Sequence, residues 1–104
     1  MGEYVPQTDG ATCTKTRQEL TRPPMFKVLL YNDHYTTMEF VVQVLAAVFR
    51  KPENEAVGIM LNVHRKGVGV CGVYPGQVAE TKVARVHQLA QDNGYPLKCS
   101  MEPE

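Results

Sequence analysis

The segment that decides the fold is Tyr-Asn-Asp-His-Tyr-Thr-Thr-Met-Glu-Phe, residues 31–40. It follows the apolar run Phe-Lys-Val-Leu-Leu at residues 26–30, which predicts a buried strand. Asn32 and Asp33 are expected to end that strand, because both side chains can hydrogen-bond the local backbone and tolerate turn geometry.

A helix is predicted to begin directly after this turn. Thr36 and Glu39 have the spacing of a capping box, in which each side chain satisfies a backbone N–H at the helix start. Asn32, Asp33 and His34 are therefore expected in a strand-to-helix turn, with acceptor groups available to a ligand. A plain turn followed by a helix cap would show the same spacing.

Length and charge limit the classes of protein that are possible. The chain has 104 residues, enough for one domain with a modest core. Its 11 basic and 11 acidic residues cancel, which argues against nucleic acid as the main partner. No apolar run approaches the ~20 residues of a membrane span. The odd set Cys13, Cys71 and Cys99 fits a reducing cytoplasm better than a disulfide framework.

The first 24 residues differ in composition from the rest of the chain. Residues 1–24 contain few apolar side chains and no periodicity, and they include Pro6, Pro23 and Pro24. We expect a mobile tail here and a compact domain over residues 25–104. A solubilising extension and a partner-contacting segment are both compatible with this composition.

Two helices are predicted in the first half of the domain. The first runs from about residue 37 to residue 50, with apolar side chains at three- and four-residue steps. The second has Pro52 in its first turn and ends at Gly67. The second helix carries two apolar lines: Ala56, Met60 and Val63 in one, Val57, Leu61 and His64 in the other.

The second half predicts strand, helix and strand. Residues 68–73 are β-branched and glycine-rich, which predicts a strand. Residues 67–72 match the motif G-x-G-x-x-G, but this motif follows a helix here, which excludes a dinucleotide-binding turn. A third helix is expected from Pro75 to about Gly94, and a last strand at residues 97–101. The predicted fold is a two-layer α+β domain, with a three-stranded sheet covered on one side by helices.

No complete active site is visible in the sequence. Cys71 and His64 are the one tempting nucleophile and base, but a lone cysteine in a buried strand is usually a small hydrophobe. The spacings of His34, His64 and His87 match no helical pair or Cys/His knuckle. We therefore expect no enzyme activity, no metal and no cofactor.

A small binding pocket explains the residues better. Met38 opens the first helix, and Met60, Val63 and His64 lie close together on the second. Methionine is flexible and lines adaptable apolar cavities, although it serves more often as core filler. With the acceptors of the preceding turn beside it, such a cavity suits an amino-terminal residue, with its ammonium at the rim and its apolar side chain inside.

At this point the chain resembles the ClpS family, the bacterial adaptors of the ATP-dependent Clp protease. The resemblance extends from Met25 to about Glu102. Its motifs are Lys-Val-Leu-Leu-Tyr-Asn-Asp-His-Tyr-Thr-Thr-Met-Glu-Phe-Val at residues 27–41, Met-Leu-Asn-Val-His at 60–64, Val-Cys-Gly-Val at 70–73, Val-Ala-Glu-Thr-Lys-Val at 78–83, and Pro96-Leu97.

This resemblance implies a βααβαβ fold and recognition of N-degrons, proteins that begin with Phe, Leu, Tyr or Trp. The adaptor would be a monomer that delivers them to the N-terminal domain of a ClpA-like Clp AAA+ ATPase, with the mobile tail needed for delivery. An interaction domain of the ribosomal-stalk type, without amine recognition, remains an alternative.

The resemblance also implies roles for individual residues. Asn32 and His64 would hold the α-amine; Asp33 and His34 take the next positions, where the family commonly has two acids. Met38 would gate the pocket. The implied pocket walls are Thr36, Val41, Ile59, Met60, Val63 and Leu97. The implied ATPase docking face is Gln77, where an acid often stands in the family, with Glu80 and Lys82.

Overall fold

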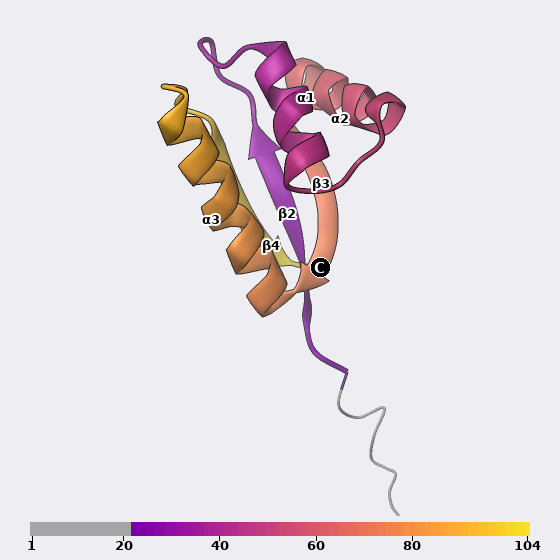
Figure 1. Cartoon of the computed structure of the whole chain (residues 1–104). Coiled ribbons are helices and arrows are strands. Elements are labelled where there is room, and N and C mark those ends of the chain that lie inside the picture. Colours follow the sequence, from indigo (N-terminus) through magenta and orange to yellow (C-terminus); the bar gives the residue numbers. More distant parts are fainter. Residues whose placement is uncertain (1–21) are drawn as a thin grey trace, which may run out of the picture.

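The structure, a computed structural model, describes residues 22–104 and has the predicted two-layer α+β architecture (Figure 1). The elements are β2 (Met25–Tyr31), α1 (Met38–Ala47), α2 (Glu53–Lys66), β3 (Val68–Pro75), α3 (Gly76–Asp92) and β4 (Lys98–Pro103). The predicted order of strand, helix, helix, strand, helix and strand is confirmed. The predicted tail at residues 1–24 falls outside the described residues up to position 21, so its mobility stays a prediction.

The sheet has three antiparallel strands in the order β3-β2-β4. β2 lies in the centre, so its backbone is hydrogen-bonded to a partner strand on each edge. Val28 and Leu30, two residues apart on β2, join the buried core with Cys71 of β3 and Cys99 of β4. Side chains two apart share one face of a strand, so the helices cover that face of the sheet.

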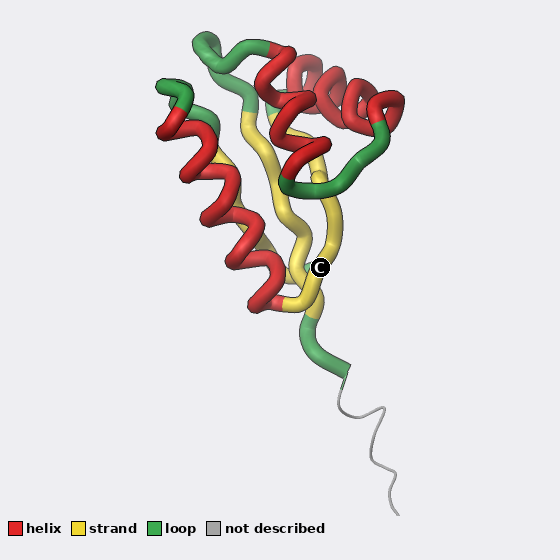
Figure 2. Tube along the Cα trace, viewed as in Figure 1, coloured by secondary structure: helices red, strands yellow, loops and turns green. Residues whose placement is uncertain are grey.

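The three helices divide this face between them. α3 packs along β4 and β2, and α2 packs against β3 and α1. In Figure 2 the loop between β2 and α1 and the connection from α3 to β4 lie at one end of the sheet, whereas the chain enters β2 at the other end. The β2–α1 loop is thus brought beside α2, although α2 begins 16 residues after the last residue of the loop.

The start of α1 differs from the prediction by one residue. Thr37, not Thr36, is the N-cap, and its hydroxyl accepts a hydrogen bond from the Phe40 N–H at 3.1 Å. The predicted capping box of Thr36 with Glu39 is therefore wrong. Its physical reason is that Asp33 binds the Thr36 side chain within the preceding turn, which leaves the neighbouring threonine to cap the helix.

α1 ends at Ala47, three residues before its predicted end at about residue 50, whereas the ends of α2 and α3 follow the predicted stop signals closely. Gly67 is the left-handed C-cap of α2, with φ 86°, a conformation that glycine adopts at no steric cost. Pro52 and Pro75 immediately precede the first residues of α2 and α3. The last two strands run two residues beyond their predicted ends, because pairing with β2 continues past the apolar alternation.

Within residues 22–104, no helix has the length and apolar character required to cross a membrane.

Candidate functional site

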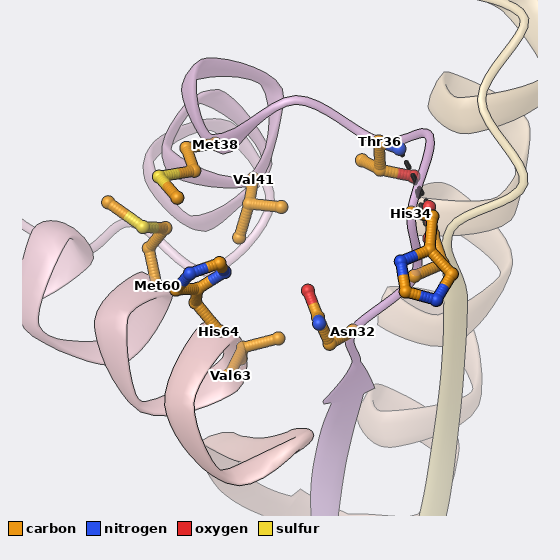
Figure 3. Close-up of a pocket in the computed structure, with 9 residues that line it drawn as sticks. Asn32, His34, Thr36, Met38, Val41, Met60, Val63 and His64 are labelled. Atoms are coloured by element: carbon orange, nitrogen blue, oxygen red, sulfur yellow. Dashed lines mark hydrogen bonds between the residues drawn. The ribbon is translucent and has the colours of Figure 1, made fainter.

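A cavity of about 250 Å³ lies between the β2–α1 loop and the helices α1 and α2 (Figure 3). The loop lines one side with polar groups, and the two helices line the other side mainly with apolar groups. The lining residues are Asn32, Asp33, His34, Thr36, Met38, Val41, Met60, Val63 and His64. The structure thus brings together nine of the eleven residues that the sequence placed in the amine site and pocket.

Asn32 and His64 are held in a fixed relation by the backbone. The Asn32 N–H donates a hydrogen bond to the carbonyl oxygen of Gly67 at 2.9 Å. Gly67 caps α2, the helix that carries His64 in its last turn. In Figure 3 the Asn32 side chain projects between His64 and His34. Three side chains that can accept hydrogen bonds therefore converge on the polar end of the cavity.

Asp33 lines the cavity and also holds the loop together. One carboxylate oxygen, Oδ1, accepts bonds from the backbone N–H groups of Tyr35 at 2.8 Å and Thr36 at 2.7 Å. The other, Oδ2, accepts from the Thr36 hydroxyl at 2.7 Å. These three bonds use most of the acceptor capacity of the carboxylate, and Asp33 still lines the cavity. Asp33 thus shapes the loop that carries its two neighbours, and its contact with an amine stays a prediction.

The electrostatics of Asp33 agree with this structural role. Partial burial alone would raise the pKa of the carboxyl group, but the hydrogen bonds from Thr36 and Tyr35, helped by His34, lower the pKa below its ordinary value. The carboxylate is thus the form that the loop stabilises. Thr36 contributes to the cavity wall while its hydroxyl is committed to Asp33.

The apolar end of the cavity has a buried floor and an exposed margin. Val41 of α1 and Val63 of α2 are 6% and 3% exposed, so they form fixed parts of the core. Met38, at the first position of α1, is 45% exposed and lies beside Met60 on one side of the cavity (Figure 3). A flexible thioether at an exposed margin can adjust to the shape of an apolar guest.

Gly69 of β3 allows α2 to approach the sheet closely enough to form this floor. A Cβ atom at this position would lie 2.7 Å from the Val63 Cγ2 atom, far inside van der Waals contact. Any larger residue at position 69 would push α2 outward together with the pocket residues that it carries.

Two predicted wall residues lie elsewhere. Leu97 is 4% exposed and belongs to the main core, and Ile59 packs against that core rather than lining the cavity. Ile59 precedes Met60 by one residue, which is a rotation of about 100° around a helix. Ile59 and Leu97 thus contribute to the core by packing, and their contact with a bound side chain stays a prediction.

The implied docking face on α3 is only partly exposed. Gln77 and Glu80 are exposed, but the Lys82 ammonium donates to the Val48 carbonyl oxygen at 2.8 Å. It also lies 5.8 Å from the Phe49 ring centre and 5.0 Å from that of Tyr74. Lys82 thus joins α3 to the C-terminal end of α1, where a cation is favoured. Val78, an apolar residue between Gln77 and Glu80 in the sequence, is also exposed and was not among the residues predicted for this face.

The thiol and metal alternatives find little support in the geometry. Cys71 and Cys99 are buried free thiols; burial raises the pKa of Cys71 far above its ordinary value and that of Cys99 to about 12. A protonated thiol is a poor nucleophile. His87 accepts a hydrogen bond from the Cys99 N–H at 3.1 Å, so it completes the edge of β4. In the described range 22–104, no three His, Cys, Asp or Glu residues form a possible metal site.

Comparison with known proteins identifies the family. Residues 21–100 match the family model of the ATP-dependent Clp protease adaptor protein ClpS. The ClpS adapter of Desulfatibacillum aliphaticivorans is 63% identical over 95 residues, covering 91% of each chain. That of Myxococcus xanthus is 57% identical over 97 residues, covering 93% of this chain and 91% of its own.

A solved relative shares the fold as well. Agrobacterium tumefaciens ClpS2, in a structure bound to L-phenylalaninamide, matches with a TM-score of 0.77 and 43% identity. The match covers 80% of this chain and 100% of that one. The resemblance noted in the sequence is thereby confirmed. This chain belongs to the ClpS family of adaptor proteins of the ATP-dependent Clp protease.

Proposed function

We propose that this adaptor recognises substrate proteins by a bulky apolar N-terminal residue, such as Phe, Leu, Tyr or Trp, and delivers them to the Clp ATPase and protease. The observation that carries the proposal is one cavity with acceptor groups at one end and an apolar floor at the other. A chain terminus is the one place in a protein where an ammonium and a side chain share a Cα atom. The cavity suits both groups at once.

The solved relative supports this assignment. L-phenylalaninamide, bound to the Agrobacterium ClpS2, carries an α-ammonium and a benzyl side chain on one carbon. In the present chain the ammonium would donate to Asn32 and His64, with His34 beside them. The side chain would enter between the two methionines and the two valines of the floor.

Delivery requires a second surface on the adaptor. Gln77, Val78 and Glu80 lie exposed on the first turns of α3, away from the residues that line the cavity. We assign to them the contact with the N-terminal domain of the ATPase. Lys82 would support this surface by fixing α3 against α1 rather than by meeting the partner. The segment before Arg22 is proposed to act in delivery, not in peptide binding.

Amine recognition can be tested with peptides that differ only at their first residue. A fluorescent Phe-initiated peptide should bind, and its N-acetylated form should bind about 10- to 100-fold more weakly, because a hydrogen bond to a charged group contributes about 1.5–3 kcal/mol. His64→Ala and Asn32→Ala should weaken the free-amine peptide to a similar extent. Asn54→Ala, at an exposed position of α2 outside the cavity, is the matched control.

The outcome separates the proposal from its alternative. An interaction domain of the ribosomal-stalk type, without amine recognition, would bind the free and acetylated peptides equally. Equal dissociation constants for the two peptides would therefore remove amine recognition from this protein.

A further inference from the structure

A second hollow adjoins the pocket on the other side of the methionine pair. It has a volume of about 540 Å³ and lies between α1 and α2. Its lining residues are Met38, Glu39, Val42, Glu53, Val57 and Met60. Neither the family assignment nor the proposed amine recognition gives this hollow a role.

The two cavities share a wall. Met38 and Met60 line both of them, so these side chains stand between the pocket and the second hollow. Figure 3 shows the two methionines on the side of the pocket opposite to His34. A peptide whose first residue occupies the pocket would pass over the second hollow where its chain leaves across the methionines.

The chemistry of the hollow combines an apolar floor with carboxylates. Val42 and Val57 supply the floor together with the two thioethers, and Glu39 and Glu53 supply the charge. Within residues 22–104 the single ion pair joins Lys27 to Glu102, so neither glutamate has an ion-pair partner in that range. An apolar groove with negative charge suits a side chain that has a long methylene stem and a cationic end.

Helix ends provide a competing reason for these glutamates. Glu39 and Glu53 stand in the first turns of α1 and α2, where the helix dipole favours acids. Glu55 occupies the same first turn of α2 and does not line the hollow. The chain thus contains a matched control that separates the charge at a helix end from the charge beside the hollow.

We propose that the second hollow binds a lysine or arginine side chain at the third residue of the substrate. This inference rests on the proposed function, because it requires the first residue to lie in the amine pocket. In an extended peptide, side chains two apart point to the same side and lie about 7 Å apart. The third residue is therefore the next one to face the adaptor after the first. Its stem packs on the valines, and its cationic end lies beside the glutamates.

The test uses Phe-initiated peptides that carry lysine, norleucine or glutamate at the third residue and alanine at the second. Norleucine retains the methylene stem without the charge. Because exposed ion pairs are weak individually, we expect lysine to bind about 2- to 5-fold more tightly than norleucine at low salt, and glutamate to bind most weakly. Raising the salt concentration should reduce the difference between lysine and norleucine.

Variants of the adaptor locate the effect. In the Glu39→Gln/Glu53→Gln double variant the ratio of the lysine and norleucine dissociation constants should fall to about 1. In Glu55→Gln the ratio should stay as in the parent protein. Thermal unfolding of all three proteins verifies that the variants remain folded.

Two failures can be told apart. If the acetylated Phe peptide binds as well as the free one, amine recognition fails and this inference fails with it. If a free Phe is required but lysine and norleucine bind equally at the third residue, the inference alone is overturned. An equal loss of the lysine preference in Glu55→Gln, or a preference for lysine only at the second residue, would also overturn it.

Discussion

The two flanks of the sheet are covered by helices in different ways. α3 places small side chains against the strands: Ala79, Val86 and Ala90 are 0%, 0% and 2% exposed. The α1–α2 pair instead places two methionines near the surface and leaves two hollows beside them. Small residues let a helix approach the sheet and fill the interface, whereas long flexible residues span a wider gap. Hollows also adjoin α3, but the candidate binding surface lies where the flexible methionines line the hollow.

The largest expected effect comes from overfilling the closed flank. Ala79→Leu should lower the free energy of unfolding by about 1–3 kcal/mol, because its three extra heavy atoms have no space beneath α3. Met60→Leu, on the open flank, should cost less than about 1.5 kcal/mol. Urea unfolding of both variants measures the contrast. Equal losses in the two variants would mean that the flanks are packed alike.

The open flank should be sensitive in ligand choice rather than in stability. Met38→Ala is expected to relax the preference for Leu over Ile and Val as first residue, because a thioether at the pocket margin crowds a branched β-carbon. One such clash is worth about 1–3 kcal/mol, and the exposure of Met38 places the effect near the lower end. The affinity ratio of Leu- and Ile-initiated peptides reports it. An unchanged ratio would exclude a gating role for Met38.

The contact of Lys82 with the end of α1, which connects the two flanks, should contribute less to the free energy of unfolding. Lys82→Met removes the hydrogen bond to the Val48 carbonyl and leaves that oxygen without its donor. We expect a loss of about 1 kcal/mol in unfolding free energy, with peptide affinity nearly intact. Arg85→Met, at an exposed position of the same helix, is the control. If Lys82→Met is as stable as the control but no longer binds the ATPase, Lys82 belongs to the docking face after all.

The smallest effect is expected at the polar end of the open flank. His34→Asp places a fixed carboxylate beside the proposed ammonium site. Binding of a Phe-initiated peptide should tighten by a few-fold, in line with the ~0.2–1 kcal/mol of an exposed ion pair. The comparison is made by fluorescence titration at neutral pH. An affinity equal to that of the parent protein would show that the side chain at position 34 does not meet the amine.

Most of the fold could be predicted because local signals agreed with the global arrangement. Apolar period and stop residues such as Gly67 marked each element. The antiparallel pairing and the strand order β3-β2-β4 were not predicted, because they join strands far apart in the sequence. The capping residue could not be predicted from its spacing. Thr36 and Thr37 are adjacent and chemically equivalent, and the choice between them depends on Asp33, three residues before the first of them.

The site was predicted less completely than the fold, for similar reasons. Family resemblance named the residues around the cavity, but whether a side chain lines it or packs behind it depends on its rotation around the helix. Ile59 and Met60 differ by one residue and have different roles. Lys82 illustrates a second limit: the carbonyl that it binds is 34 residues away in the sequence. No local pattern contains such a contact.

The position of the chain ends has a practical consequence. The Glu104 N–H donates to the Met25 carbonyl oxygen at 3.0 Å, so the C-terminus lies beside the residue at which β2 begins (Figure 1). β2 has seven residues, which separates this point from the pocket loop by about 20 Å. A fluorophore or surface anchor attached at residue 104 would therefore stand clear of a bound peptide. Residue 104 is a suitable attachment point for single-molecule measurements of substrate capture.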